Sequence, residues 1–548
     1  MKKKKKENGM KPFILALSIC LLASCSLEEN PRDQITAEEA YPNANALYLN
    51  TVATLYSYIG GSADGQGLQG TCRGVYDLQT LGSDEAMLPT RGGDWYDGGI
   101  WQQMYRHDWT AGHELAQNSW LYLYKVITLC NRSLEQLDTH ADLLTEQTLT
   151  NYKSEVRAIR AIYYWYLLDL FGRVPIITST VVAADEVQQS ERSQVFEFVV
   201  SELWACCPAL AKENSVKQSG DYYGRVTLPV AYFVLAKLML NAEVYADDDW
   251  TDGQRLDGSK IMFEIYGKRM NAWEAAIHYC DSIEDMGYRL EKNYQDNFVV
   301  HNENSCENIW VIAMDKDLYY NEQQNIFRSW HYRHAAAYGI SGENGLCATR
   351  RTLEIFGYGT DRQDSRFDLN YWAGTVYDRN GNIVYDRIGN PLVYWPFEVE
   401  FELSGSPYVE TAGARMKKYD IDRNATKDGK LMDNDIVLFR FADVLLMRAE
   451  AKLRNGQDGQ GDFDLVRERA GMPSRPISLQ NLADERLLEL CWEGWRRQDQ
   501  IRFGQYKSLI TDNEWAEKVD ESDGHTTVYP IPDAILVGNR KLTQNKGY

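Results

Sequence analysis

The chain has 548 residues, 44% of them hydrophobic, and its 79 acidic and 58 basic side chains give a formal net charge of −21. This is the composition of a folded globular protein, and the length exceeds that of an ordinary single domain. Because a field of this sign repels phosphate groups, the charge argues against nucleic acid and anionic bilayers as partners.

The first 24 residues have the pattern of a lipoprotein signal peptide. A lysine-rich start precedes the apolar run Phe13 to Ala23, which is too short to span about 30 Å of hydrocarbon. The sequence Leu22-Ala-Ser-Cys25 then resembles a bacterial lipobox, so we expect cleavage before Cys25 and lipid attachment, with palmitate among the acyl chains, at that cysteine. Cleavage would remove six lysines and one glutamate and leave a net charge of −26. The alternative is an ordinary signal peptide with an incidental cysteine.

The segment Pro89 to Trp101 is the densest candidate binding loop. It combines aromatic and charged side chains with four glycines, which let a backbone approach a ligand closely or adopt positive φ. We expect Trp95 to stack on the ligand, with two further rings in support and two polar partners. The predicted ligand-binding residues of this loop are Arg91, Asp94, Trp95, Tyr96 and Trp101. The alternative is that these rings fasten the loop to the body of the protein.

Helical periodicity dominates the chain beyond this loop. The apolar residues from Ile159 to Leu170 fall on one helical face, and Gly172 and Pro175 then end the pattern. Similar stripes run from Trp273 to Ile283 and from Leu438 to Leu453. Residues 120–137, 230–245 and 484–497 are predicted to be helical in the same way. The sequence therefore predicts a mainly α fold, in which alanine-containing helices pack in pairs as in tetratricopeptide repeats.

Long polar segments rich in aromatic residues separate the helices, at 60–115, 290–350 and 365–420. Loops of this length in a compact domain are often functional. The chain has 35 Tyr and 15 Trp against 16 Phe, and Tyr and Trp each combine an apolar face with a polar group. Such side chains suit a ligand that offers flat C–H patches and hydroxyl groups, which favours a sugar.

A second aromatic cluster surrounds Trp330 and Tyr338, which we also predict to contact the ligand. Its other members are His331, Tyr332, Asn344 and Arg350. Farther along the chain, Tyr394 and Trp395 could flank the site or belong to a strand edge.

Charged residues near the C-terminus have helical spacing: Arg486, Glu489, Glu493, Arg496 and Asp499. Carboxylates beside basic groups could serve catalysis, but this spacing favours a buried ion-pair network that orders the last helices.

Enzyme, metal and cofactor motifs are not visible. A glycoside hydrolase would need two carboxylates about 5–10 Å apart, and no local signature marks such a pair. His113-Glu114 begins like a zinc-protease motif, but position 117 is Gln rather than the second His. Eight cysteines would remain besides Cys25; their pairing cannot be derived from the sequence, and Cys130, Cys280 and Cys491 are predicted to be small core residues. We therefore predict no catalytic residues, no metal ion and no cofactor.

Four C-terminal stretches, in this order, resemble the SusD/RagB family: 437–456, 463–473, 484–504 and 528–548. The helices at 120–131 and 155–175 match the family as well, so the resemblance covers nearly all of the chain after residue 24. It implies one domain over residues 25–548, built on a tetratricopeptide-like helical scaffold with long irregular loops and small β elements.

The resemblance also implies a function. Members of this family are lipid-anchored outer-membrane proteins that capture nutrients and deliver them to a TonB-dependent transporter of the SusC type. Glu28-Glu29 resembles the acidic pair that directs related lipoproteins to the cell surface. We thus expect an outward-facing protein that binds oligo- or polysaccharide and has no enzymatic activity. Two alternatives stay open: the same role for oligopeptides, and an extracellular glycoside hydrolase.

Overall fold

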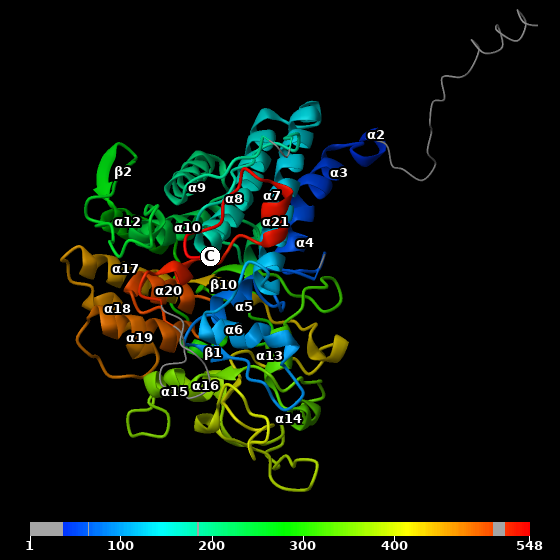
Figure 1. Ribbon diagram of the computed structural model, residues 1–548. Helices are drawn as coiled ribbons and strands as arrows, with labels where there is room; N and C mark the ends of the chain where they lie inside the picture. Colours follow the sequence, from blue (N-terminus) through cyan, green and yellow to red (C-terminus); the bar gives the residue numbers. More distant parts are fainter. Residues whose placement is uncertain (1–36, 64, 184–185, 508–520) are drawn as a thin grey trace, which may run out of the picture.

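The computed structural model describes residues 37–63, 65–183, 186–507 and 521–548. The predicted signal peptide and Cys25 lie outside the described residues. Within those ranges, we find no helix with the length and apolar character needed to cross a membrane. Figure 1 shows a body built mainly of helices, with irregular loops gathered at one end.

The prediction of a mainly α fold is confirmed. The α-helices are α2 (Ala37–Ala40), α3 (Ala44–Tyr48), α4 (Thr54–Ile59), α5 (Val75–Thr80), α6 (Ile100–Arg106), α7 (Glu114–Thr139), α8 (Glu146–Phe171), α9 (Arg192–Cys206), α10 (Leu228–Leu240), α11 (Ala242–Tyr245), α12 (Ala272–Asp285), α13 (Gln324–Ser329), α14 (Tyr332–Ala337), α15 (Arg350–Phe356), α16 (Phe367–Asn370), α17 (Phe441–Arg454), α18 (Gln460–Arg469), α19 (Leu479–Leu490), α20 (Arg496–Phe503) and α21 (Asp533–Gly538). The long helices pack as neighbours, α7 on α8, α8 on α9, α10 on α12, and α12 on α17 (Figure 1). These pairs form the predicted helical scaffold.

Local sequence signals set the ends of the longest helices. Thr145 caps α8, since its hydroxyl accepts the backbone N–H of Thr148. The same helix ends at Phe171 because Gly172 has φ +67°, as the glycine at this position predicted.

One predicted helical stripe begins in a strand. Leu438 was expected to share a helix with Leu453, but it lies in β10 (Ile436–Arg440), and α17 starts only at Phe441. All five residues of β10 are buried, and the strand pairs antiparallel with β4. Pairing and burial on both faces outweigh the helical spacing here.

Two other predicted helices are interrupted. The expected helix 484–497 is divided between α19 and α20, because Trp492 (φ 66°) and Gly494 (φ 75°) are left-handed and cannot continue an α-helix. The expected helix 230–245 breaks at Asn241, between α10 and α11.

The β structure is limited to small two-stranded antiparallel sheets. The strands are β1 (Ala86–Met87), β2 (Met262–Ile265), β3 (Lys268–Asn271), β4 (Asn308–Ile312), β5 (Cys347–Ala348), β6 (Tyr371–Trp372), β7 (Gly374–Thr375), β8 (Val393–Tyr394), β9 (Arg415–Met416) and β10. In the β1–β5 sheet, Met87 lies opposite Cys347. This pairing brings the segment before the glycine-rich loop next to residues about 260 positions later in the chain.

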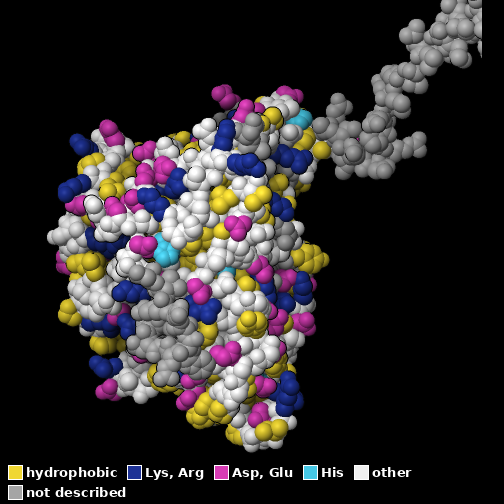
Figure 2. Space-filling model, in the orientation of Figure 1, with side chains coloured by type: hydrophobic (Ala, Val, Ile, Leu, Met, Phe, Trp, Pro, Cys, Tyr) yellow, Lys and Arg dark blue, Asp and Glu magenta, His cyan; other side chains and the backbone are white. Residues whose placement is uncertain are grey.

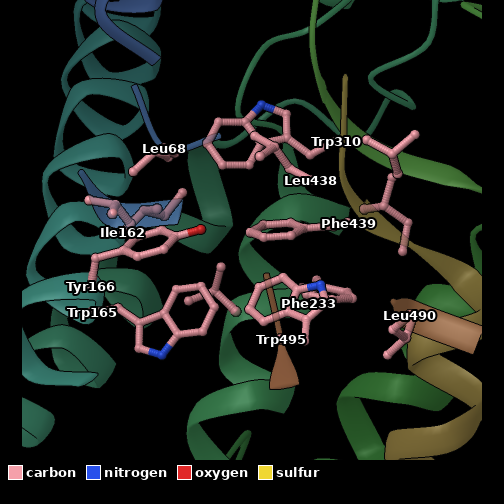
Figure 3. Packing of buried hydrophobic residues seen from close by; sticks show 14 of the residues in the cluster. Leu68, Ile162, Trp165, Tyr166, Phe233, Trp310, Leu438, Phe439, Leu490 and Trp495 are labelled. Atoms are coloured by element: carbon pink, nitrogen blue, oxygen red, sulfur yellow. The ribbon is translucent and has the colours of Figure 1, made fainter. Parts of the chain in front are cut away.

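Aromatic rings from distant segments meet in the core (Figure 3). Phe233 of α10 stacks on Phe439 of β10, with ring centroids 4.3 Å apart. Trp165 of α8 stacks on Trp495 at 5.9 Å. Full burial of one such side chain stabilises the fold by about 1.5–3 kcal/mol. The core therefore holds β10 and the α19–α20 connection rigidly against the helical layer.

The predicted C-terminal ion-pair network is confirmed. Its members form pairs of 2.5 to 2.8 Å: Arg486 with Asp443 and Asp499, Arg496 with Asp84, Glu489 with Arg366 and Arg440, and Glu493 with Arg440. Burial alone would raise the pKa of Glu489, but the guanidinium groups of Arg469, Arg440 and Arg366 outweigh it and hold the pKa well below its ordinary value. These carboxylates join β10 to the last helices.

Candidate functional site

The loop 89–101 connects β1 to α6 through left-handed backbone. Arg91 and Asp94 exchange backbone hydrogen bonds of 2.9 and 3.1 Å, which close a tight turn. Three of the four glycines in the loop have φ between 67° and 90°. Trp95 has φ 62°, a conformation that costs an L-residue roughly 1–2 kcal/mol and is concentrated at functional sites.

Arg91 fastens this loop to the body of the protein. Its side chain is buried, and its guanidinium donates to the carbonyl oxygens of Gly345 (3.2 Å), Val409 (3.0 Å) and Ala412 (2.9 Å). Arg415 donates to the same Gly345 oxygen at 3.2 Å. Burial and the nearby Arg415 lower the pKa of Arg91 to about 9. These contacts favour a positioning role for Arg91 over the ligand contact expected from the sequence.

A cavity of about 400 Å³ opens beside the loop, and its volume is within the range of small-molecule sites. Its lining includes Arg73, Asp94, Trp95, Asp97, Tyr332 and Glu343. The structure thus places Asp94 and Trp95 of the predicted loop together with Tyr332 of the second aromatic cluster. We call this space the Trp95 cavity.

Hydrogen bonds fix Trp95 and Tyr332, two of the aromatic side chains that line the Trp95 cavity. The indole Nε1 of Trp95 donates to the carbonyl oxygen of Glu343 at 3.0 Å. The hydroxyl of Tyr332 donates to Oδ2 of Asp94 at 3.0 Å. Burial and this hydrogen bond raise the pKa of Tyr332 to about 12, so the hydroxyl stays protonated at neutral pH.

Arg73 was missed by the sequence analysis, and Asp97 was not among the predicted binding residues. Nη2 of Arg73 lies 2.8 Å from Asp97, and Nε1 of Trp101 donates to the same carboxylate at 2.8 Å. Like Trp95, both residues have left-handed backbone, with φ 59° for Arg73 and 43° for Asp97. No local pattern marks Arg73, because its place in the cavity depends on contacts with a loop some 20 residues later.

Two more predicted residues of the loop occupy contrasting positions. Trp101 is only 1% exposed and underlies the cavity, with the guanidinium of Arg73 5.4 Å from its ring centroid. Tyr96 is 57% exposed and lies outside the lining of the cavity.

Trp330 and Tyr338 line a second cavity of about 690 Å³, which shares no lining residue with the first. Trp330 is 1% exposed, stacks on His334 at 3.8 Å, and donates from Nε1 to the Met416 carbonyl at 2.7 Å. It is mainly a packing residue at this position. Tyr338 is half-buried, with its ring 5.1 Å from that of Trp330.

Apart from Tyr332, which lines the Trp95 cavity, the other residues of the second predicted cluster lie outside both linings, as do Tyr394 and Trp395. His331, Asn344 and Tyr394 are buried, Trp395 is exposed, and Arg350 is 4.0 Å from Glu400 at the surface. Figure 2 shows acidic and basic side chains interspersed over one face, with hydrophobic side chains at the loop-rich end.

The described cysteines are all free thiols. Cys130, Cys280 and Cys491 are fully buried, as predicted for small core residues. Within the described ranges, His, Cys, Asp and Glu side chains form no group of three that could hold a metal ion.

Two family profiles match this chain. The SusD family matches residues 306–548, and the family described as "Starch-binding associating with outer membrane" matches residues 77–240. The starch-binding protein SusD of Bacteroides thetaiotaomicron is 25% identical over 88% of this chain and 87% of its own length. A SusD-like protein of Bacteroides ovatus is 24% identical over 92% of this chain and 85% of its own.

Solved structures share the fold. Surface glycan-binding protein A from Bacteroides thetaiotaomicron superposes with a TM-score of 0.70 at 20% identity, covering 92% of this chain and all of that one. A laminarin-binding SusD-like protein has a TM-score of 0.67 at 21% identity with the same coverage. The two profiles, the full-length relatives and the common fold agree, and the chain belongs to the SusD/RagB family.

Proposed function

We propose that this protein is a cell-surface lipoprotein that binds oligo- or polysaccharide in the Trp95 cavity and delivers it to a TonB-dependent transporter of the SusC type. The observation that carries the binding proposal is the meeting of Trp95 and Tyr332, from segments 237 residues apart, in one open cavity with polar partners.

The chemistry of the Trp95 cavity suits a saccharide. The indole of Trp95 and the ring of Tyr332 offer apolar faces for C–H patches of a sugar ring. Asp94 can accept hydrogen bonds from sugar hydroxyls, and Arg73 can donate them. Because the aromatic side chains are already hydrogen-bonded to the protein, little side-chain entropy would be lost on binding.

The names of the relatives support the same ligand class. SusD of Bacteroides thetaiotaomicron is a starch-binding protein, and surface glycan-binding protein A of that organism, with a TM-score of 0.69 to this chain, has been solved with laminarihexaose.

Binding without hydrolysis fits the two aspartates of the cavity. Asp97 already accepts from Arg73 and Trp101, and Asp94 accepts from Tyr332. Both carboxylates thus have protein partners that hold them in place, so we propose a binding role for them rather than a catalytic one.

Calorimetric titration of residues 26–548 with a panel of neutral plant, microbial and host oligosaccharides and mixed peptides tests the proposal. We expect an oligosaccharide to bind. Trp95→Ala should lower the affinity for it at least about tenfold, which corresponds to about 1.4 kcal/mol of binding free energy. Tyr266→Ala is the control, because it also removes an aromatic ring. Tyr266 is 70% exposed and lies in the β2–β3 hairpin, outside the lining of the Trp95 cavity.

The outcomes separate the alternatives. Binding of peptides but not of oligosaccharides would show that the ligand is a peptide. Product formation by protein free of contaminating hydrolases would show that the protein is an enzyme rather than a binding protein. Equal affinities of the wild-type protein and Trp95→Ala would move the site away from the Trp95 cavity.

The anchor and the transporter need tests in cells. Cys25→Ala should release the folded protein from the membrane fraction. Trp95→Ala should reduce import of a labelled oligosaccharide while the protein stays at the membrane. Unchanged fractionation would refute the anchor, and unchanged import would refute delivery through this site.

A further inference from the structure

The second cavity contains cations that lack carboxylate partners. Among its lining residues are Tyr338, Trp372, Arg379, Lys417 and Arg423. In the described part of the chain, none of the three cations forms an ion pair, whereas the buried Arg366 and Arg440 each contact at least two carboxylates. We call this space the cationic cavity.

Aromatic rings hold two of these cations in place. The guanidinium of Arg379 lies 5.2 Å from the ring centroid of Tyr338. Nζ of Lys417 lies 4.4 Å from the ring centroid of Trp372 and donates to the carbonyl oxygen of Asp368 at 2.6 Å. Nη2 of Arg379 is buried and has no acceptor in the described structure, so the guanidinium keeps unused hydrogen-bonding capacity.

The carboxylates that line the cationic cavity do not neutralise these cations by direct contact. Asp422 is buried and accepts the backbone N–H groups of Asn424 (2.7 Å) and Asp433 (3.1 Å). Asp420 is exposed and forms no ion pair with Lys417. Burial lowers the pKa of Lys417 and of Arg379, and the neighbouring Arg423 lowers the latter further. A bound anion would favour the charged form of both groups.

A tandem repeat contributes Arg379 to the lining of this cavity. Val376-Tyr-Asp-Arg-Asn-Gly-Asn-Ile383 is followed directly by Val384-Tyr-Asp-Arg-Ile-Gly-Asn-Pro391. In both copies the aspartate, Asp378 or Asp386, accepts backbone N–H groups two and four residues later at 2.8–2.9 Å.

The two copies place equivalent arginines on different rings. The first copy sets Arg379 over Tyr338, and the second sets Arg387 over Tyr332, 5.7 Å from its centroid. Arg387 does not line the cationic cavity. It is therefore an internal control for Arg379, with the same local turn and the same kind of ring contact.

We propose that the cationic cavity is a second binding site, for the carboxylate or sulfate group of an acidic saccharide. Arg379, Lys417 and Arg423 contact the oxyanion, while Trp372 and Tyr338 stack on the sugar ring. A volume of about 690 Å³ is in the range of small-molecule sites. This inference depends on the proposed function only in assuming that the ligand is a saccharide. The cations and rings that carry it line a different cavity from the Trp95 cavity.

Calorimetry on residues 26–548 tests this site with three probes: an oligogalacturonide, its carboxyl-reduced neutral counterpart, and the same neutral backbone carrying sulfate. We expect at least one acidic probe to bind about tenfold more tightly than the neutral one. The difference should shrink as the salt concentration rises. The carboxylate and sulfate arms identify which oxyanion the cavity takes.

Variants locate the binding. Arg379→Gln and Lys417→Gln should each remove the preference for the acidic probe, while Arg387→Gln keeps it. Unchanged melting temperatures would show that the variants are folded. Equal affinity for acidic and neutral probes, no binding of either acidic probe, or equal losses in Arg379→Gln and Arg387→Gln would overturn the proposal.

The variants test the two proposed sites independently. Binding of the acidic probe that survives Trp95→Ala and is lost in Arg379→Gln supports the cationic cavity whatever happens at the Trp95 cavity. Acidic binding that is lost in Trp95→Ala and kept in Arg379→Gln assigns it to the Trp95 cavity and overturns the second site.

Discussion

The indole of Trp95 is hydrogen-bonded to the backbone carbonyl of Glu343, which lies 248 residues later in the chain. Two residues beyond Glu343, a Cβ atom on Gly345 would lie 2.6 Å from Cε2 of Trp95. The Gly345 carbonyl itself accepts from Arg91 and Arg415. The position of the proposed stacking ring therefore depends on a glycine in a distant loop that two buried arginines hold in place.

Gly345→Ala should weaken oligosaccharide binding without removing any group that contacts the ligand. The added methyl displaces the indole of Trp95, because the arginine contacts prevent the backbone from retreating. We expect a loss of at least about tenfold in affinity by calorimetry. Gly461→Ala is the matched control, since Gly461 has no neighbouring atom within 4 Å of the added Cβ. Full affinity in Gly345→Ala would argue against Trp95 as a ligand contact.

Cys72 should report on occupancy of the Trp95 cavity. It lines that cavity and is partly exposed, and burial raises the pKa of its thiol, so alkylation by iodoacetamide should be slow at neutral pH and faster in alkali. A saturating oligosaccharide should slow the reaction at Cys72. Cys306, which is also partly exposed but lies outside the cavity, should react at an unchanged rate. Peptide mass spectrometry measures both rates, and equal rates with and without ligand would place the sugar elsewhere.

Arg440→Met should strongly destabilise the fold. Its guanidinium contacts Glu307, Glu489 and Glu493, and its removal leaves buried carboxylates short of a partner. Breaking a buried pair in this way costs about 3–5 kcal/mol. The change should appear as a lower urea midpoint. Arg351→Met, which removes one exposed ion pair, should change stability by less than about 1 kcal/mol. A midpoint for Arg440→Met equal to that of this control would contradict the structural role of the network.

Glu85→Gln should flatten the pH dependence of stability. Glu85 is fully buried, and burial raises its pKa from 4.5 to about 7, while Oε1 accepts the backbone N–H of Trp492. Between these two pKa values the folded state holds a proton that the unfolded state has released. Stability from this group is therefore complete below about pH 4.5 and is lost as the pH rises to about 7, by about 3 kcal/mol.

Glutamine keeps the oxygen acceptor for Trp492 and does not titrate. The variant should thus be more stable than the wild-type protein above about pH 7, as measured by urea denaturation across this range. Glu354→Gln, at an exposed position, should follow the wild-type profile. If the stabilities of Glu85→Gln and the wild-type protein change in parallel with pH, Glu85 is not the source of the pH dependence.

Several elements could be predicted because their signals are local. The apolar spacing from Ile159 to Leu170 and the stop at Gly172 predicted most of α8. The charges at Glu489 and Arg486 predicted a structural network, since spacing along a helix shows which side chains share a face. The glycine-rich loop could be singled out by composition, and it does border a cavity.

The sequence by itself thus determined the mainly helical scaffold and the family, because periodicity and motifs are properties of short segments. Only the tertiary structure decided that Leu438 belongs to a strand, because the residues on either side of it, Val437 and Phe439, pair with β4. It also decided that Arg91 fastens its loop while Arg73 borders the cavity. Both outcomes depend on contacts between segments far apart in the chain, and no local pattern records which distant backbone will lie within hydrogen-bonding reach.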